Sequence, residues 1–257
     1  MSKDFHGLPC WYEMTAPDPV AAGKFYAAVI GWTVAKAPME GFDYYLASVG
    51  KRQAAGMMAP PMPGIPPNWC VYFAVSDCDA TAAAIVADGG AQIAAPADIP
   101  GTGRFAIVSD PQGAAFGILQ PLPMEDGDGG GAYDPATPGF GAWHELMTPD
   151  PEAALAFYGK HFGWTPSTVM PMSTEMGNYY LFAGSMGDMG GMMGLPQKGM
   201  QPAWLPYLGV ASIAKAKTAV EAAGGKIVHG PMEVPGGGWI LQGIDPQGAY
   251  FALSGPK

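Results

Sequence analysis

The sequence predicts an α+β fold made of two tandem repeats, because two long segments carry the same motifs in the same order. Residues 11–19 and 143–151 both begin Trp-x-Glu and end Pro-Asp-Pro, and each is followed by a Phe-Tyr pair and a Gly-Trp pair. Asp-Pro-Gln-Gly then occurs at residues 110–113 and again at 245–248. The distance in sequence between the two copies of each motif is far longer than the ~20–50 residues of a solenoid repeat, and it therefore indicates duplicated domains.

Each repeat opens with a strand and a helix. Residues 11–15 are a short β-prone run. Asp18 is a typical N-cap, Pro19 suits the first helical position, and Gly31 ends a helix that we expect to reach about Val29. The second repeat supplies the same three signals as Asp150, Pro151 and Gly163.

The rest of each repeat predicts more strands and one further helix. Residues 44–49 and 53–58 read as a strand pair around Gly50-Lys51. The second half predicts strand, helix, strand and strand at residues 69–75, 79–88, 105–108 and 114–119. Asp77 and Ser212 are the expected N-caps of this helix and of its counterpart at 213–223. Each repeat is therefore two β-α-β-β-β units, and the chain holds four.

These boundaries divide the 257 residues into four parts. We expect an N-terminal tail at 1–9, a first module at 10–120, a linker at 121–141 and a second module at 142–254. The linker contains the glycine-rich acidic run 125–131, which cannot bury a core and is expected to be mobile. Residues 60–67 and 195–202 are irregular stretches that join the half-units.

Composition narrows the classes of partner. The net charge of −10 and the pI near 4.6 argue against nucleic acid and against an anionic membrane surface. No apolar run approaches the ~18 residues of a membrane span, and no signal-peptide pattern follows Met1. All three cysteines lie in the first repeat, so no disulfide framework is shared, and a reducing cytoplasm is the expected compartment.

Together, the paired β-α-β-β-β units, the Asp-capped helix with Phe-Tyr before Gly-Trp, and the strand after Asp-Pro-Gln-Gly resemble the vicinal oxygen chelate superfamily. That superfamily includes glyoxalases, extradiol dioxygenases and bleomycin-resistance proteins. The resemblance covers residues 10–120 and 142–254, and is greatest to two-module bacterial members of ill-defined function. It implies that each module curls its sheet into a cup, in which catalytic members hold one divalent metal.

The resemblance also implies where metal ligands would lie. In the first repeat these positions are occupied by Trp11, Val71, Gly117 and the Gly56-Met57 pair. In the second repeat they are occupied by Trp143, Pro206, Ala252 and the Gly191-Met192 pair. None of these side chains is a ligand type that such metals take. We therefore expect no metal cofactor, unless a divalent ion binds at non-standard positions.

Two carboxylates are the candidate catalytic residues. Strand residues two apart share a face, so Glu13 lies on the side of Trp11, and Glu145 on the side of Trp143. A carboxylate beside an indole in an apolar cup is expected to have a raised pKa, which suits proton transfer. The alternative is that both glutamates only bond local backbone or an arginine and orient their strands.

Aromatic residues and one arginine are the candidate ligand-binding set. Aromatic linings bind flat, weakly polar molecules, and the alternative for the buried ones is ordinary core packing. Arg104 could meet an anionic group or lie on the solvated surface, and Trp239 shares its aligned position. The full set is Trp11, Trp69, Tyr72, Arg104, Trp143, Trp204, Tyr207 and Trp239.

Three functions stand at this point. The first is a metal-free protein that binds a small aromatic or apolar molecule. The second is a lyase, isomerase or dioxygenase-like enzyme that uses Glu13 or Glu145 as acid, base or displaced metal ligand. The third is a non-catalytic dimerisation scaffold. The duplication allows either a monomer with an internal pseudo-dimer or a homodimer, since two like modules can pair about a pseudo-twofold axis.

Overall fold

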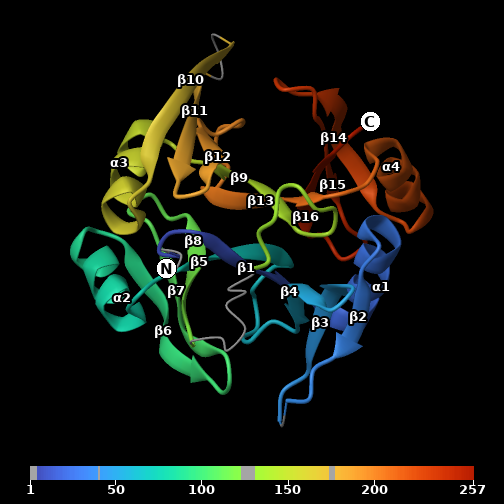
Figure 1. The fold of residues 1–257 in the computed structure, drawn as a ribbon, viewed down its shortest axis with the longest axis horizontal. Helices are drawn as coiled ribbons and strands as arrows, with labels where there is room; N and C mark the ends of the chain where they lie inside the picture. The colour runs from blue at the N-terminus through green and yellow to red at the C-terminus, as the bar shows by residue number, and fades with distance from the viewer. Residues whose placement is uncertain (1–4, 40, 123–130, 174–176) are drawn as a thin grey trace. The chain divides into compact units, whose positions relative to one another are not determined.

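The computed structural model describes residues 5–39, 41–122, 131–173 and 177–257. Its elements fall into four β-α-β-β-β units, as the sequence predicts (Figure 1). The first repeat contains β1 (Pro9–Thr15), α1 (Pro19–Ile30), β2 (Thr33–Lys36), β3 (Tyr44–Val49), β4 (Arg52–Met58), β5 (Asn68–Ala74), α2 (Cys78–Ala87), β6 (Ala91–Ile99), β7 (Gly103–Ser109) and β8 (Ala115–Pro121). The second repeat contains β9 (Gly141–Met147), α3 (Pro151–Phe162), β10 (Thr165–Ser173), β11 (Gly177–Gly184), β12 (Gly187–Met193), β13 (Ala203–Gly209), α4 (Ile213–Ala222), β14 (Lys226–Glu233), β15 (Trp239–Ile244) and β16 (Tyr250–Gly255).

The strands form two eight-stranded sheets of identical topology. Their orders are β2-β3-β4-β1-β5-β8-β7-β6 and β10-β11-β12-β9-β13-β16-β15-β14. Within each half, the first strand runs parallel to the last strand, as in β1 with β4 and β5 with β8. The remaining neighbours within each half are antiparallel. The α+β fold with paired β-α-β-β-β units is therefore confirmed.

The helices begin where the sequence places their caps. The Asp18 side chain accepts the backbone N–H of Ala21, and the helix ends at Gly31 in the left-handed region with φ +92°. The Asp150 side chain and Gly163 do the same for α3. Glycine suits such a C-cap because it has no Cβ to clash at positive φ.

The chain divides into two compact units, and each draws on both repeats. Among the described residues, unit 1 contains 5–10, 71–122 and 144–205 without 174–176. Unit 2 contains 11–70 without 40, 131–143 and 206–257. Each unit thus combines the first half of one repeat with the second half of the other.

Unit 1 has an aromatic core. Phe73 lies at its centre, with its ring centroid 4.9 Å from that of Trp164 and 5.3 Å from that of Trp204. Phe116 and Tyr158 pack 5.4 Å apart in the same cluster. Phe73 meets both tryptophan rings edge to face, a geometry that adds stabilisation beyond the area the rings bury.

Unit 2 has an equivalent core around Tyr26. Its ring meets Trp69 edge to face at 5.1 Å and Phe251 at 5.9 Å. Trp32 packs 6.1 Å from Trp69 and donates its indole N–H to the carbonyl of Gly139 at 2.7 Å. The Gly-Trp motif of the repeat therefore helps to build the core of its unit.

The segment predicted as a linker is partly built into unit 2. Strand β8 extends to Pro121, and most of the acidic run that we expected to be mobile lies outside the described residues. Beyond it, the side chains of Ala132 and Phe140 are each 1 % exposed. Arg52 holds this segment through an ion pair with Asp134 and through its position 4.1 Å above the Phe140 ring. Apolar and aromatic residues after position 131 explain why this part packs.

None of the helices in the described ranges has the length and apolar character that crossing a membrane requires.

Candidate functional site

Strand β1 presents one buried and one open face. Tyr12 and Met14 are fully buried, whereas Trp11 and Glu13 are half-buried. The alternation of side chains along a strand places Trp11 and Glu13 on the same side, as the sequence predicts. The two residues therefore share the less covered face of the strand.

Tyr44 of β3 links these two side chains. The indole N–H of Trp11 donates to the Tyr44 hydroxyl oxygen at 2.9 Å. The Tyr44 hydroxyl in turn donates to Oε2 of Glu13 at 3.1 Å. The result is a directed chain of two hydrogen bonds that ends on a carboxylate, here called the Trp11–Tyr44–Glu13 row.

Gly56 of β4 makes room for this row. Glu13 is paired with Gly56 in the parallel ladder, and Leu46 of β3 faces the same glycine from the other side. A Cβ added at Gly56 would lie only 1.8 Å from the Tyr44 hydroxyl. The Tyr44 side chain thus lies across Gly56, a crossing that any larger residue would block.

The Tyr44 hydroxyl stays protonated. Burial raises its pKa, and the nearby carboxylate of Glu13 raises it further, while the hydrogen bond from Trp11 acts in the opposite direction. A neutral phenol can accept from the indole and donate to the carboxylate at the same time. The direction of the hydrogen bonds in the row is therefore fixed by chemistry as well as by geometry.

The second repeat carries the same residue types. Trp143 and Glu145 are half-buried on β9, and Glu145 pairs with Gly191 of β12. A Cβ added at Gly191 would lie 2.1 Å from the ring of Tyr179. Tyr179 is only 8 % exposed, so this tyrosine is more deeply covered than the half-buried Tyr44.

Tyrosines lie next to the positions predicted for the later metal ligands, because Tyr72 follows Val71 and Tyr207 follows Pro206. Tyr72 pairs with Gly117, and a Cβ added there would meet the Tyr72 ring at 2.2 Å. Its counterpart Tyr207 pairs with Ala252 and accepts a hydrogen bond from the Gln242 side chain at 2.6 Å. Both tyrosines are buried, with 4 % and 2 % of their surface exposed.

Trp69 and Trp204 lie in the aromatic cores. Trp69 is 7 % exposed, and its indole N–H donates to the Tyr26 hydroxyl at 3.0 Å. Tyr26 then donates to the carboxylate of Asp245 at 3.0 Å. The chain Trp204, Tyr158 and Asp110 repeats this arrangement in unit 1. Both tryptophans therefore pack in the cores of their units, as the core-packing alternative describes. Each hydrogen-bond chain also links a helix to the Asp-Pro-Gln-Gly turn of the other repeat.

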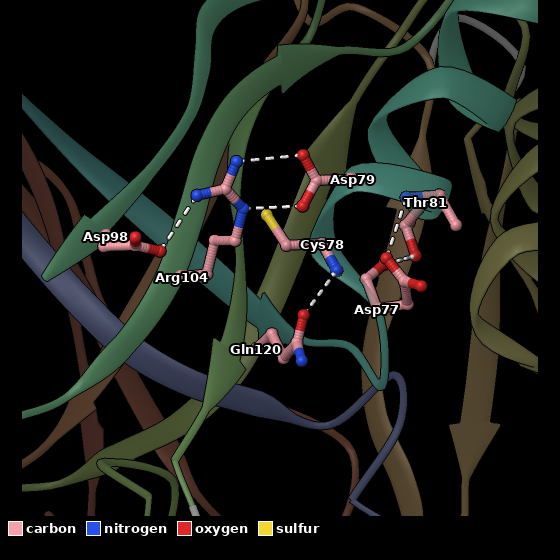
Figure 2. Close-up of polar contacts among 8 residues, drawn as sticks. Asp77, Cys78, Asp79, Thr81, Asp98, Arg104 and Gln120 are labelled. Atoms are coloured by element: carbon pink, nitrogen blue, oxygen red, sulfur yellow. Dashed lines mark hydrogen bonds and ion pairs between the residues drawn. The ribbon is translucent and has the colours of Figure 1, made fainter.

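Arg104 is engaged with two carboxylates. Figure 2 shows its guanidinium between Asp79 and Asp98. Two nitrogens bind Asp79 at 2.5 and 2.9 Å, and a third binds Asp98 at 2.9 Å. These partners raise the pKa of Arg104, so its charge is permanent. The aligned residue Trp239 is half-buried, with the ammonium of Lys257 4.5 Å above its ring.

Two shallow cavities lie away from the Trp11–Tyr44–Glu13 row. One of about 320 Å³ lies in unit 2 between the α1 side chains Ala21 and Phe25 and the turn at Pro246. The other, of about 380 Å³, lies in unit 1 beside His6 and Phe162. Across the described ranges, no cluster of three or more His, Cys, Asp or Glu side chains is placed to hold a metal ion.

Sequence reasoning missed Tyr44, although the repeat carries a signal for it. Tyr44 and Tyr179 occupy equivalent positions, as do Gly56 and Gly191. Both copies keep the tyrosine together with the glycine, and this pairing indicates that the tyrosine ring lies over the glycine. Alternation along β1 could group Trp11 with Glu13, but only the sheet register brings Tyr44 to them.

Comparisons with known proteins agree with this fold. Residues 11–119 match the glyoxalase-like domain, and residues 142–253 match the glyoxalase/bleomycin resistance protein/dioxygenase superfamily. CFP32 of Mycobacterium tuberculosis (strain CDC 1551 / Oshkosh), named as a glyoxylase, is 34 % identical over 97 % of this chain and 95 % of its own length. The anthracycline biosynthesis protein DnrV of Streptomyces peucetius is 30 % identical over 98 % and 94 %.

Solved structures show the same architecture at low identity. The 2,2',3-trihydroxybiphenyl 1,2-dioxygenase of Sphingomonas wittichii strain RW1 matches with a TM-score of 0.67 and 13 % identity, covering 97 % of this chain and 90 % of that one. The Mn(II)-bound glyoxalase of Novosphingobium aromaticivorans gives a TM-score of 0.63 and 13 % identity, covering 97 % and 82 %. With both repeats matched and a relative of 34 % identity along nearly the whole chain, this protein belongs to the glyoxalase/bleomycin resistance/dioxygenase superfamily, also called the vicinal oxygen chelate superfamily.

Proposed function

We propose that this protein binds a flat aromatic small molecule on the open face of β1, without the metal ligands usual in its superfamily. The observation that carries the proposal is the Trp11–Tyr44–Glu13 row. It joins a half-buried indole and phenol to an oriented carboxylate. Aromatic surface with a few well-placed polar groups is the common composition of small-molecule sites.

The residues at the expected ligand positions do not fit a divalent metal. In unit 2 these positions hold Trp11 and Gly56, and the Tyr44 side chain lies over the glycine. In unit 1 they hold Val71 and Gly117, with the ring of Tyr72 over the glycine. Indole, aliphatic groups and glycine offer no side-chain donor that Mn, Fe or Zn prefers. The proposed binding therefore relies on stacking and hydrogen bonds.

The names of two relatives support the class of ligand. DnrV of Streptomyces peucetius and DauV of Streptomyces sp. (strain C5) are both named as anthracycline biosynthesis proteins, and each is about as long as this chain. Anthracyclines are planar fused-ring molecules that carry phenolic hydroxyls. Such a ligand could stack on Trp11 and Tyr44 and donate a hydroxyl hydrogen to Glu13.

Binding can be tested by equilibrium dialysis against a panel of planar aromatics that includes an anthracycline and the dihydroxyanthraquinone quinizarin. We expect saturable binding that Glu13→Gln weakens about tenfold, because a neutral amide replaces the charged acceptor. Tyr44→Phe should weaken binding less, since the ring remains. Failure of the wild-type protein to bind any panel member would remove the proposal.

A second candidate is an enzyme that uses Glu13 for proton transfer. The hydrogen bond from Tyr44 favours it, because this bond orients the carboxylate in the manner that a general base requires. If so, the wild type should convert a bound panel compound to a product, and Glu13→Gln should leave the same compound unchanged. Turnover that survives this substitution and Glu145→Gln would exclude both glutamates as catalytic groups.

A further inference from the structure

Phe42 is an exposed aromatic residue that extends the site. It lies just before β3, and 41 % of its surface is exposed. Its ring is stacked on that of Tyr44, with centroids 6.0 Å apart and planes 26° apart. An exposed phenylalanine loses hydrophobic stabilisation that burial would supply, so a ligand able to cover it would gain that free energy.

Phe42 and Tyr44 form a stacked pair next to Trp11. Tyr44 meets Trp11 through its hydroxyl at one end and meets Phe42 through its ring face. Tyr44 thus contacts both the half-buried Trp11 and the exposed Phe42, and these three aromatic residues are here called the aromatic strip. The Glu13 carboxylate accepts a hydrogen bond from Tyr44 beside them. A single-ring molecule could cover only part of this strip, whereas a fused-ring molecule could span it.

The second repeat lacks this extension. The residue equivalent to Phe42 is Gly177, which has φ +70°, and a Cβ added there would have no neighbouring atom within 4 Å. Trp143, Tyr179 and Glu145 are otherwise retained at their positions. The aromatic strip is therefore a feature of the first repeat, although the three residues of the row occur in both.

We propose that Phe42 determines specificity in the first repeat by stacking on fused-ring ligands, so that this repeat binds one such ligand per chain more tightly than the second repeat does. The proposal rests on the proposed function. Phe42 adds contact area for ligands longer than one ring and contributes nothing to a ligand that Trp11 and Tyr44 alone can hold. An aromatic pair of this kind contributes enough to change affinity by roughly three- to tenfold.

The test uses two phenolic probes of different length, quinizarin with its three fused rings and the single-ring hydroquinone. Dissociation constants and stoichiometry are measured by equilibrium dialysis for wild type, Phe42→Ala, Phe42→Gly and Phe42→Tyr. Val20→Ala is the matched control, because Val20 is 42 % exposed on α1 and lies outside the strip. We expect about one tight quinizarin site per chain, lost affinity of roughly three- to tenfold in the alanine and glycine variants, and wild-type affinity in the tyrosine and control variants.

The outcomes separate the two proposals. Absence of quinizarin binding to the wild type would remove the proposed function and this inference with it. Binding that is equal in Phe42→Ala and Val20→Ala would overturn the role of Phe42 and leave the function standing. Equal weakening for quinizarin and hydroquinone would show that Phe42 does not discriminate by ligand length, which also overturns the inference. Because Phe42 is exposed, its variants should unfold at the wild-type urea concentration.

Discussion

At the scale of single residues, the sequence predicts which strand positions share a face but not which residue meets them. Alternation places Trp11 beside Glu13, and the structure has both half-buried on one side of β1. Tyr44 lies on β3, which is a neighbour of β4 and not of β1. The contact of Tyr44 with Trp11 and Glu13 therefore depends on how the strands are paired on either side of Gly56. Long-range register is set by packing of the whole sheet, and this is why the partner could not be predicted locally.

His144 is a second residue whose position follows from alternation along its strand, because its side chain lies on the opposite face from that of Trp143. Its side chain is fully buried, and Nδ1 lies 2.8 Å from the carbonyl oxygen of Met189. A short contact with a carbonyl means that Nδ1 carries the hydrogen and donates it. Burial lowers the pKa of His144 from 6.5 to about 4, so the imidazole is neutral in the folded protein.

Acid should therefore destabilise the fold through His144. Between about pH 6.5 and pH 4 the unfolded chain protonates this imidazole while the folded chain does not, so the free energy of unfolding falls as the pH is lowered. Urea unfolding should show a loss of about 2 kcal/mol from this group between about pH 7 and about pH 4.5. His144→Gln should reduce this loss, and His229→Gln, at an exposed position, should not. Equal pH dependence in both variants would contradict the assignment.

At the scale of elements, predictions are most accurate where a local signal fixes an end. The caps at Asp18, Asp150 and Ser212 lie one residue before α1, α3 and α4, as expected. The edge strands β2, β6, β10 and β14 are required by the repeated unit, but the sequence signals do not give their residue ranges. Their exposed side chains give no clear alternation, because only one neighbouring strand covers an edge.

The cap of α2 offers a measurable example. Oδ1 of Asp77 accepts the N–H of Ala80 at 2.9 Å and satisfies one of the orphan donors of the first turn. We expect Asp77→Ala to lower the free energy of unfolding by about 1 kcal/mol. Asp43→Ala removes the same charge from an exposed ion pair with Lys36 and should cost less than about 0.5 kcal/mol in urea unfolding. Equal losses would show that charge, not capping, accounts for the effect.

At the scale of the whole molecule, sequence repeats and compact units do not coincide. The Tyr26 hydroxyl of the first repeat binds Asp245 of the second within unit 2. Gln247 also exchanges two hydrogen bonds with the backbone of Asp18, at 2.8 Å each. Gln112 and Asp150 do the same in unit 1. The duplicated motifs are visible in the sequence, but their pairing with the opposite copy is not, because identical motifs cannot specify which copy they meet.

Separated repeats should therefore fail to fold alone. A fragment of residues 1–122 would leave the buried Tyr26 and Asp110 without their partners Asp245 and Tyr158, and each unsatisfied buried group costs about 1–3 kcal/mol. We expect monomers of this fragment and of the fragment 131–257 to lack cooperative thermal unfolding, and cooperative unfolding to return when the two fragments are mixed or co-expressed. Cooperative unfolding of either fragment as a monomer would contradict this expectation, and the intact chain serves as the reference.

The composition of the two units, each built from both repeats, is also informative about how the duplicated chain arose. Two identical single-repeat chains that exchanged halves would form the same two units, so a gene fusion through the segment after Pro121 could join an obligate pair without altering its cores. After fusion, a residue such as Tyr26 must still suit its partner in the other copy, which restrains drift at those positions. Positions outside these pairs are free to change, and Phe42 against Gly177 and Arg104 against Trp239 are two examples of positions where the copies differ.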